Sequence, residues 1–256
     1  MATRVEVNVE APLATLQFVS GTGVNVLSRE TCLALKQRID DLSAEGDVRV
    51  WILTGSGRTF LAGADIRQMA QLDPDAARDF SRLGNGALTA LAAAPAVTIA
   101  AVNGAALGGG CELAMACDLR VMAEGARIGL PETTLGVVPG WGGTQRLARL
   151  IGVGRAKEMI FTSRTLDADE ALAVGLVNQA VPSGEAPSAA RELARRVLAM
   201  GPKAVSLAKQ AVDLGLATDL PAGIEIETEH FAECFGHPEA KEGLTAFLEK
   251  RKPSWQ

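Results

Sequence analysis

The sequence contains no tyrosine and only two histidines and four cysteines, and aromatic residues make up 4% of its 256 residues. So few aromatic side chains leave little for the stacking platforms that hold single-stranded nucleic acids. Cations are not in excess either, because 25 basic residues face 30 acidic ones and the formal net charge is −5. This balance provides no electrostatic footprint for nucleic acid or an anionic membrane. We therefore expect neither as a partner.

Candidate metal ligands are also few and scattered. They are Cys32, Cys111, Cys117 and Cys234, with His230 and His237. The cysteines show no CxxC spacing, and two of them flank an apolar helical run, which is typical of reduced core residues. We expect no metal site.

Long hydrophobic runs are missing as well. The longest, from Leu88 to Val102, contains Pro95 and is too short to span a bilayer. Residues 1–12 alternate in polarity and lack the apolar segment of a signal peptide. The sequence thus predicts a soluble protein of the reducing cytoplasm.

A hydrophobic content of 48% in 256 residues indicates a packed globule with one main core. Residues 4–9 and 13–19 alternate like a hairpin, and Ser28 is placed to cap a helix that runs to about residue 44. Short apolar strands at 47–53, 97–102 and 119–122 alternate with helical segments at about 74–93 and 110–116. This order predicts an α/β fold.

The pattern changes near Pro187. Beyond it, residues 188–200, 202–216, 222–234 and 238–251 all have helical patterns, several with proline near the start. A strand predicted at 176–181 precedes this change. We therefore expect a core over residues 1–187 and a helical region over 188–256.

The segment from Asn103 to Asp118, NGAALGGGCELAMACD, is the most informative part of the chain. Its three glycines precede a predicted helix, where exposed backbone N–H groups bind anions. A phosphate loop would continue with lysine and serine or threonine, but Cys111 and Glu112 follow instead, and the GxGxxG pattern is absent. A tight crossing of strand and helix explains the glycines equally well.

Glu112 lies on an otherwise apolar helix, where a charge is costly to bury without a purpose. Glu132 follows twenty residues later, between Pro131 and Gly136. Taken alone, Glu132 could be an ordinary acid favoured by a helix N-terminus. Taken together, two carboxylates and exposed N–H groups indicate an enzyme that moves protons beside an oxyanion.

Four segments resemble the crotonase, or enoyl-CoA hydratase/isomerase, superfamily, and most closely enoyl-CoA hydratase. They are residues 60–66 (FLAGADI), 103–118, 130–147 (LPETTLGVVPGWGGTQRL) and 242–255 (EGLTAFLEKRKPSW). The resemblance implies a spiral of strand–strand–helix turns with a C-terminal helical region that forms trimers, often as dimers of trimers. It also implies a coenzyme A thioester as substrate, no cofactor, and a place in fatty-acid β-oxidation.

The resemblance assigns roles to four residues. Ala64 and Gly109 correspond to the backbone donors of the oxyanion hole. Glu112 corresponds to the base that activates water, and Glu132 to the acid that protonates the α-carbon. Trans-2-enoyl-CoA would thereby become 3-hydroxyacyl-CoA.

Further positions are implied to contact the substrate. They are Ala62, Asp65, Ile66, Gly108, Trp141, Phe247 and Lys250. In relatives, the last two positions reach the coenzyme of a neighbouring subunit, although a lysine near a chain end is commonly just solvated. Asp65 could serve only as a loop cap. Trp141 stands where a small residue is common, and its bulk predicts a preference for short acyl chains.

Three alternatives stay open. An isomerase or another acyl-CoA lyase of the superfamily commonly keeps a different set of acids around the same oxyanion hole. An RNA-binding or scaffolding member would need a lysine-rich helix, whereas residues 28–44 carry three basic and three acidic side chains. An inactive site would keep both glutamates without a chemical reason.

Overall fold

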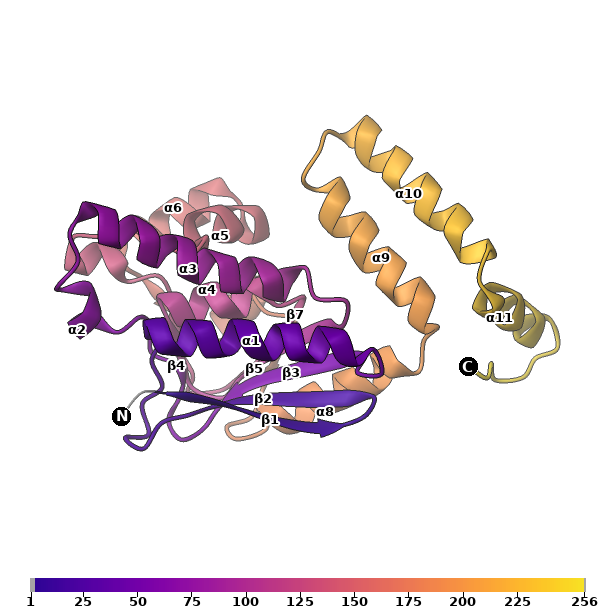
Figure 1. Ribbon diagram of the computed structural model, residues 1–256, viewed down its shortest axis with the longest axis horizontal. Coiled ribbons are helices and arrows are strands. Elements are labelled where there is room, and N and C mark those ends of the chain that lie inside the picture. Colours follow the sequence, from indigo (N-terminus) through magenta and orange to yellow (C-terminus); the bar gives the residue numbers. More distant parts are fainter. Residues whose placement is uncertain (1–2, 256) are drawn as a thin grey trace.

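The computed structural model describes residues 3–255 as two β-sheets surrounded by helices, with further helices extending from this body (Figure 1). The large sheet has, in spatial order, β1 (Arg4–Glu10), β2 (Leu13–Val19), β3 (Val50–Gly55), β5 (Val97–Val102), β7 (Leu119–Ala123) and β10 (Gln179–Val181). The small sheet has β4 (Thr59–Leu61), β6 (Ala105–Leu107), β8 (Ile128–Gly129) and β9 (Thr165–Leu166). Neighbouring strands are parallel except for the pairs β1–β2 and β8–β9.

The chain alternates between the two sheets and then forms a helix. The helices of the body are α1 (Arg29–Glu45), α2 (Ile66–Met69), α3 (Pro74–Ala92), α4 (Gly109–Ala116), α5 (Gly143–Ile151), α6 (Val153–Thr162) and α7 (Ala168–Ala173), with the 3₁₀ helix η1 (Glu132–Leu135). Thus β3 and β4 lead to α3, β5 and β6 lead to α4, and β7 and β8 lead through η1 to α5. This confirms the spiral of strand–strand–helix turns.

The two faces of the large sheet carry separate cores, because successive strand residues point to opposite sides. Val50 and Ile52 pack with α8 (Ala186–Leu198), which contributes three buried alanines. Trp51 and Leu53 belong to the larger core beneath α1, α3 and α4. The candidate residues of α4 are therefore built on the more deeply covered face.

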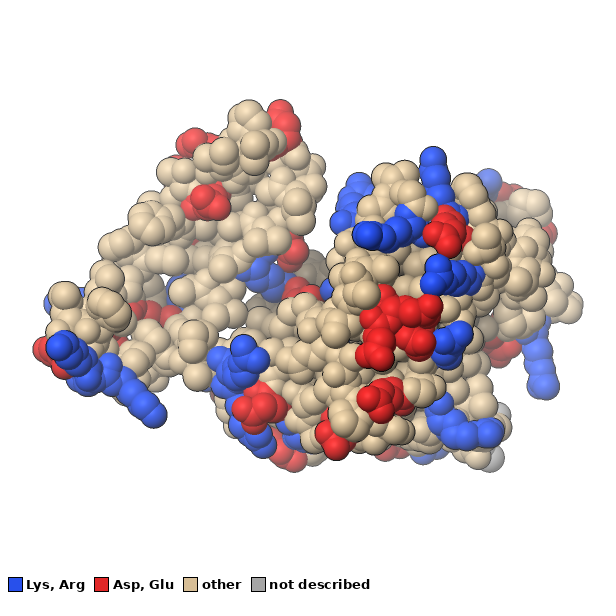
Figure 2. Space-filling model, turned by 180° about the vertical axis from the view of Figure 1, so that it is seen from behind, with Lys and Arg blue, Asp and Glu red and all other residues tan. Residues whose placement is uncertain are grey.

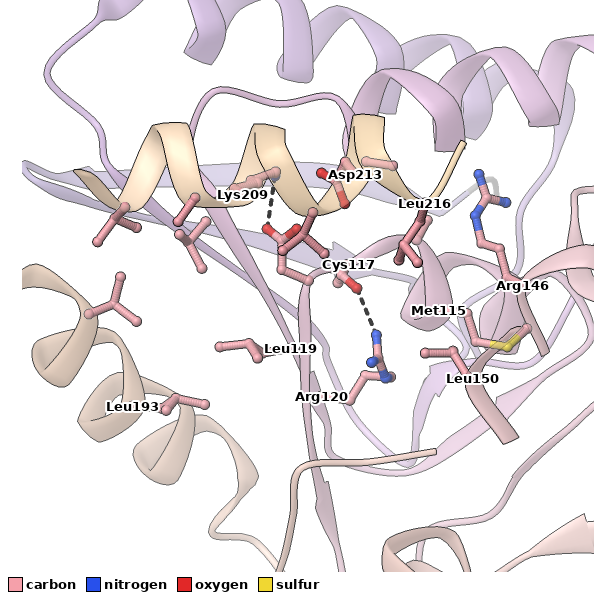
Figure 3. Close-up of a pocket in the computed structure, with 18 of the residues that line it drawn as sticks. Met115, Cys117, Leu119, Arg120, Arg146, Leu150, Leu193, Lys209, Asp213 and Leu216 are labelled. Carbon is pink, nitrogen blue, oxygen red and sulfur yellow. Dashed lines mark hydrogen bonds and ion pairs between the residues drawn. The ribbon is translucent and has the colours of Figure 1, made fainter. Parts of the chain in front are cut away.

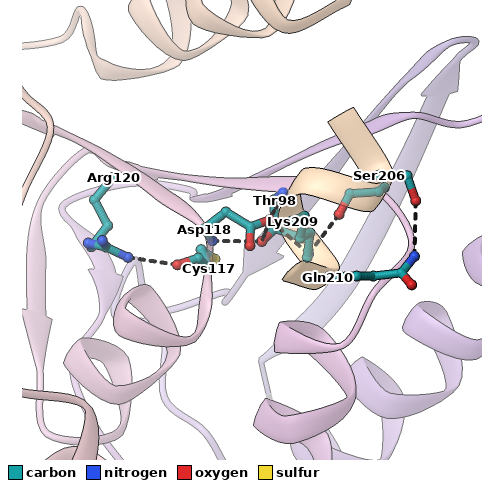
Figure 4. A network of polar contacts seen from close by, with 8 residues as sticks. Thr98, Cys117, Asp118, Arg120, Ser206, Lys209 and Gln210 are labelled. Atoms are coloured by element: carbon teal, nitrogen blue, oxygen red, sulfur yellow. Dashed lines mark hydrogen bonds and ion pairs between the residues drawn. The ribbon is translucent and has the colours of Figure 1, made fainter. Parts of the chain in front are cut away.

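The remaining helices extend from the body. They are α9 (Pro202–Gly215), α10 (Leu220–Phe235) and α11 (Pro238–Leu248). The Lys209 side chain joins α9 to the sheet, because its Nζ donates to the Ala96 carbonyl at 3.0 Å and to Asp118 Oδ2 at 2.9 Å (Figure 4). Among residues 3–255, no helix is both long and apolar enough to cross a membrane.

The predicted hairpin, the helix capped by Ser28 and the central strands all form, with ends that differ by a few residues. The strand expected at 176–181 covers only Gln179–Val181. The division expected between residues 187 and 188 falls within α8, which packs on the sheet. Two separate domains stay a prediction, and the packing itself groups α8 with the body.

Candidate active site

The start of α4 lies in a space that excludes side chains. Gly108 has a φ of 52°, in the left-handed region that favours glycine. A Cβ on Gly110 would lie 2.0 Å from the Leu61 carbonyl oxygen, and one on Gly109 would lie 2.5 Å from Cζ3 of Trp141. The close crossing of helix and strand considered from the sequence is thus present, and it brings the α4 backbone against Leu61 and Trp141 where side chains would stand.

Two backbone N–H groups meet this crossing from different turns of the spiral. Ala64 lies in the segment after β4 and pairs as an isolated bridge with Leu27. Its neighbour Gly63 approaches α4 closely, because a Cβ on Gly108 would lie 3.8 Å from the Gly63 Cα. Within residues 3–255, neither the Ala64 N–H nor the Gly109 N–H donates to a protein acceptor. The donor capacity of both N–H groups is therefore not used within this part of the chain.

Glu112 lies one turn into α4 and is 2% exposed. Its Oε1 accepts hydrogen bonds from the backbone N–H groups of Trp141 and Gly143, both at 2.8 Å. Burial raises the pKa of this carboxyl, while the two N–H donors and the Arg146 charge act to lower it. The fixed donors orient the carboxylate and favour its ionised form.

Glu132 begins η1 and approaches Gly108. Its Oε1 lies 3.1 Å from the position that a Gly108 Cβ would take, whereas its Oε2 is buried and has no hydrogen-bond partner among the described residues. Burial and, to a lesser extent, the Glu112 charge raise the pKa of Glu132 to about 7. Hence the fold brings together two carboxyl groups from different elements and gives them different surroundings.

Trp141 is a core residue, 3% exposed. Its ring packs against Phe80 with 5.2 Å between centroids, and its Nε1 donates to the Phe80 carbonyl at 3.2 Å. A Cβ on Gly84 would lie 2.2 Å from Nε1, so glycines on both α3 and α4 make room for the indole. The ring therefore fills the space behind Gly109.

The other positions implied to contact the substrate lie in two groups. Ala62, Asp65 and Ile66 surround Ala64, and Ile66 is 51% exposed. The Asp65 carboxylate accepts from the N–H groups of Arg67 and Gln68, so it caps α2, as the alternative interpretation proposed. A substrate contact for Asp65 stays a prediction.

Phe247 and Lys250 are at the other end of the molecule. Phe247 is on α11 and is 82% exposed, and Lys250 follows that helix on the surface. Figure 1 shows α11 at the end of the extended helices, far from α4. Within one chain, neither residue joins the two glutamates.

Two residues, one in contact with Glu112 and one behind that contact, were not predicted from the sequence. Gly143 supplies one of its N–H donors, and Arg146 donates from Nη1 to the Trp141 carbonyl at 2.9 Å. A signal was available, because Gly142 and Gly143 precede a helix just as the triple glycine does. The reasoning about exposed N–H groups at the triple glycine applies equally to this pair of glycines.

A large cavity lies elsewhere, between the body and α9. It encloses about 1000 Å³ and is mostly apolar, with Met115, Leu150 and Leu193 facing Lys209 and Asp213 (Figure 3). Ala64, Gly109 and both candidate glutamates are absent from its lining. The two carboxyl groups and the two N–H groups therefore lie outside it.

Comparison with solved structures defines the fold. The crystal structure of an enoyl-CoA hydratase from Bacillus anthracis matches 98% of this chain and 98% of its own, with a TM-score of 0.94 and 39% sequence identity. The chain thus has the crotonase fold.

Sequence comparison defines the family. Residues 8–256 match the enoyl-CoA hydratase/isomerase family. A short-chain-enoyl-CoA hydratase of Clostridium acetobutylicum is 43% identical over 95% of this chain and 94% of its own length. A crotonyl-CoA hydratase of Syntrophomonas wolfei is 44% identical over 96% of this chain and 95% of its own length. The chain belongs to the enoyl-CoA hydratase/isomerase family, which confirms the superfamily and the enzyme class expected from the sequence.

Proposed function

We propose that this enzyme hydrates trans-2-enoyl-CoA thioesters to 3-hydroxyacyl-CoA. The observation that carries the proposal is the contrast between its two carboxyl groups. Glu112 is held by two N–H donors that favour its ionised form, whereas Glu132 has a buried oxygen without a partner. Hydration needs one carboxylate to accept a proton and one carboxylic acid to donate one.

The proposed reaction begins with the thioester oxygen between the N–H groups of Ala64 and Gly109. Water attacks the β-carbon as Glu112 takes one of its protons, and the electron pair of the double bond moves toward the carbonyl oxygen. The two donors stabilise this developing negative charge. Glu132 then delivers its proton to the α-carbon. The net change is the addition of water, so the chemistry itself requires no redox partner or metal ion.

The electrostatic setting supports this order of roles. A pKa of about 7 keeps a substantial fraction of Glu132 protonated near neutral pH, ready to act as the acid. Each turnover leaves the proton on Glu112 and the charge on Glu132. Dehydration is the same path reversed, with the roles of the two groups exchanged.

We further propose that the acyl chain is short. The names of the two bacterial relatives, short-chain-enoyl-CoA hydratase and crotonyl-CoA hydratase, support this choice. So does Trp141, whose ring fills the volume behind Gly109. A Trp141→Ala variant should accept longer chains better relative to crotonyl-CoA. An unchanged ratio of kcat/KM values across chain lengths would contradict this role for Trp141.

The proposal includes a homotrimer or a dimer of trimers in the cytoplasm. Large apolar side chains are exposed along α9, α10 and α11. They include Leu216, Leu220, Ile224, Phe231, Phe235, Phe247 and Leu248. On the face in Figure 2, these helices are mostly uncharged, whereas the body carries interspersed charges of both signs. A second copy of this apolar surface is a suitable partner. Light scattering that shows a monomer at all protein concentrations would contradict the proposed oligomer.

Product analysis separates the hydratase from its nearest rival. Incubation with crotonyl-CoA should give a product heavier by one water, and the reverse reaction should start from 3-hydroxybutyryl-CoA. An isomerase would instead convert a 3-enoyl-CoA to the 2-enoyl isomer without a change in mass. Isomerisation in the absence of hydration would overturn the proposal.

A further inference from the structure

Arg146 is half-buried on α5 and bonds to the backbone segment that holds Glu112. Its Nη1 donates to the Trp141 carbonyl at 2.9 Å, and its own N–H donates to the Gly142 carbonyl at 2.8 Å. Gly142 has a φ of 92°, and a Cβ there would lie 2.3 Å from Nη1. The guanidinium thus closely underlies the turn at residues 141–143.

This turn presents the two N–H groups that bind Glu112. The Trp141 carbonyl belongs to the planar peptide unit that lies between these two donors, so fixing its direction limits the rotation of the backbone on either side. Both contacts to Glu112 Oε1 measure 2.8 Å, so a small rotation of the turn would lengthen at least one of them. The guanidinium makes no hydrogen bond or ion pair with Glu112, so it acts on this carboxylate through the backbone and through its charge.

Arg146 has no carboxylate within 4.0 Å in the part of the chain that the structure describes. Burial lowers its pKa, and Glu112 is the main charge that opposes this effect. A half-buried cation without an ion pair is therefore compensated chiefly by the candidate base. In Figure 3, Arg146 is drawn at the cavity wall with Met115 and Leu150.

Few other charges face Glu112. Helix α4 packs against α3, α5, β4 and β6, and the two strands carry no charged residue. The charged side chains of α3 form pairs on its exposed face. Glu132 of η1 interacts unfavourably with Glu112, and the Cys111 thiol of α4 has a raised pKa because of burial. The buried Arg120 of β7 donates to the Ala114 and Cys117 carbonyls near the end of α4, and Arg146 is the cation whose charge lowers the pKa of Glu112.

We propose that Arg146 is a positioning residue that fixes the turn at residues 141–143 against Glu112 and keeps this carboxylate charged and ready to accept a proton. The inference rests on the proposed function, in which Glu112 is the base. It predicts two separable effects, one from the geometry of the guanidinium and one from its charge.

Three variants separate these effects. Arg146→Gln removes the charge and the planar donor, whereas Arg146→Lys keeps the charge and loses the planar geometry. Arg149→Gln is the matched control. It removes an exposed arginine of the same helix, whose guanidinium donates to the Gln145 carbonyl at 3.0 Å and not to the turn. The readout is kcat/KM for crotonyl-CoA hydration as a function of pH, together with kcat.

Arg146→Gln should lower kcat by about tenfold or more. It should also move the acid limb of the pH profile of kcat/KM upward by about 1 pH unit, because the loss of a nearby opposite charge disfavours the ionised form of Glu112. Arg146→Lys should lower kcat but leave the acid limb near that of the wild type. Arg149→Gln should change neither. If Arg146→Gln does not fold, the lysine variant decides, and an unchanged kcat there overturns the positioning role.

An acid limb that stays in place in Arg146→Gln, or moves equally in Arg149→Gln, would also overturn the inference while wild-type hydration upholds the proposed function. A wild type that binds crotonyl-CoA without hydrating it would instead defeat the proposed function, and this inference with it.

Discussion

The indole ring of Trp141 occupies the space into which a side chain on Gly109 would project, with 2.5 Å between Cζ3 and the position of the Cβ. The backbone N–H of the same tryptophan donates to Glu112 at 2.8 Å. One residue thus supports both halves of the proposed chemistry. Its ring restricts the helix start that presents the proposed oxyanion donor, and its main chain orients the proposed base.

The first prediction follows from this relationship. Gly109→Ala should lower kcat by about 100–1000-fold, the usual cost of losing one oxyanion donor. The added methyl group must displace either the ring or the first turn of α4, and the Gly109 N–H moves with that turn. Steady-state hydration of crotonyl-CoA measures the loss, and circular dichroism verifies that the variant is folded.

Trp141→Phe provides the companion variant. A smaller ring makes room for the methyl group, while the backbone N–H to Glu112 is retained. The double variant should therefore be more active than Gly109→Ala alone. Two losses that simply multiply would show that the sites act independently and would contradict the steric account.

The second prediction concerns pH. Turnover in either direction requires one proton shared by Glu112 and Glu132, so kcat/KM should follow a bell whose alkaline limb lies near the pKa of about 7. Water is neutral, so hydration and dehydration should have superimposable profiles. Full activity at a pH well above 7 would exclude Glu132 as the acid. So would pH profiles whose acid or alkaline limbs differ between hydration and dehydration.

The third prediction concerns stability. The pKa of Glu132 rises from an ordinary value of 4.5 to about 7, so the native state binds this proton more tightly than the unfolded chain does. The free energy of unfolding therefore decreases as pH rises from 4.5 to about 7. Above that pH, the titration of Glu132 causes no further decrease. Glu132→Gln should remove this loss of stability, because glutamine does not ionise.

Allowing for the partial exposure of Glu132, the glutamine variant should gain about 1–2 kcal/mol over the wild type above the upper pKa, and the gain should vanish in acid. Denaturant titrations at several pH values measure this difference. Exposed Glu45 is the control, because Glu45→Gln should have little effect. An equal effect of Glu132→Gln at all pH values would contradict the assignment.

The fourth prediction concerns the connection between α9 and the body. The side chains of Lys209 and Asp118 are 10% and 21% exposed, and Asp118 Oδ2 also accepts from the Thr98 N–H at 2.7 Å. Lys209→Met should destabilise the protein by about 2–4 kcal/mol, because it leaves a largely buried carboxylate without its cation.

Lys203 of the same helix is the matched control, since its partner Glu233 is half exposed and such pairs contribute about 0–1 kcal/mol. Replacing Asp118 by asparagine in the Lys209→Met background should recover part of the loss. Equal unfolding free energies for the Lys203→Met and Lys209→Met variants would show that the buried pair has no special role.

Local patterns were sufficient to predict much of the fold. The alternation in β1 and β2, the cap at Ser28 and the buried strand at Val97–Val102 depend on near neighbours, so the sequence shows them directly. The placement of α8 was less accessible, because its small alanines give no signal of the sheet face that they cover.

The site divides in the same way. Glu112 stood out because a charge on an apolar helix needs an explanation, and the glycines at 108–110 marked a close backbone approach. The bonds from Trp141 and Gly143 to Glu112 span 29 and 31 residues, and they depend on how α5 meets α4. No local pattern encodes that meeting, so the contribution of Arg146 became visible only in the folded chain.

The most direct test follows the loss of enoyl absorbance of crotonyl-CoA with the wild type, Glu112→Gln and Glu132→Gln. Both replacements keep the size of the side chain and remove only its acid–base function. The account predicts rapid hydration by the wild type and severe loss in both variants, with thioester binding retained. Hydration that survives in either variant at the wild-type rate would contradict the two-carboxylate mechanism.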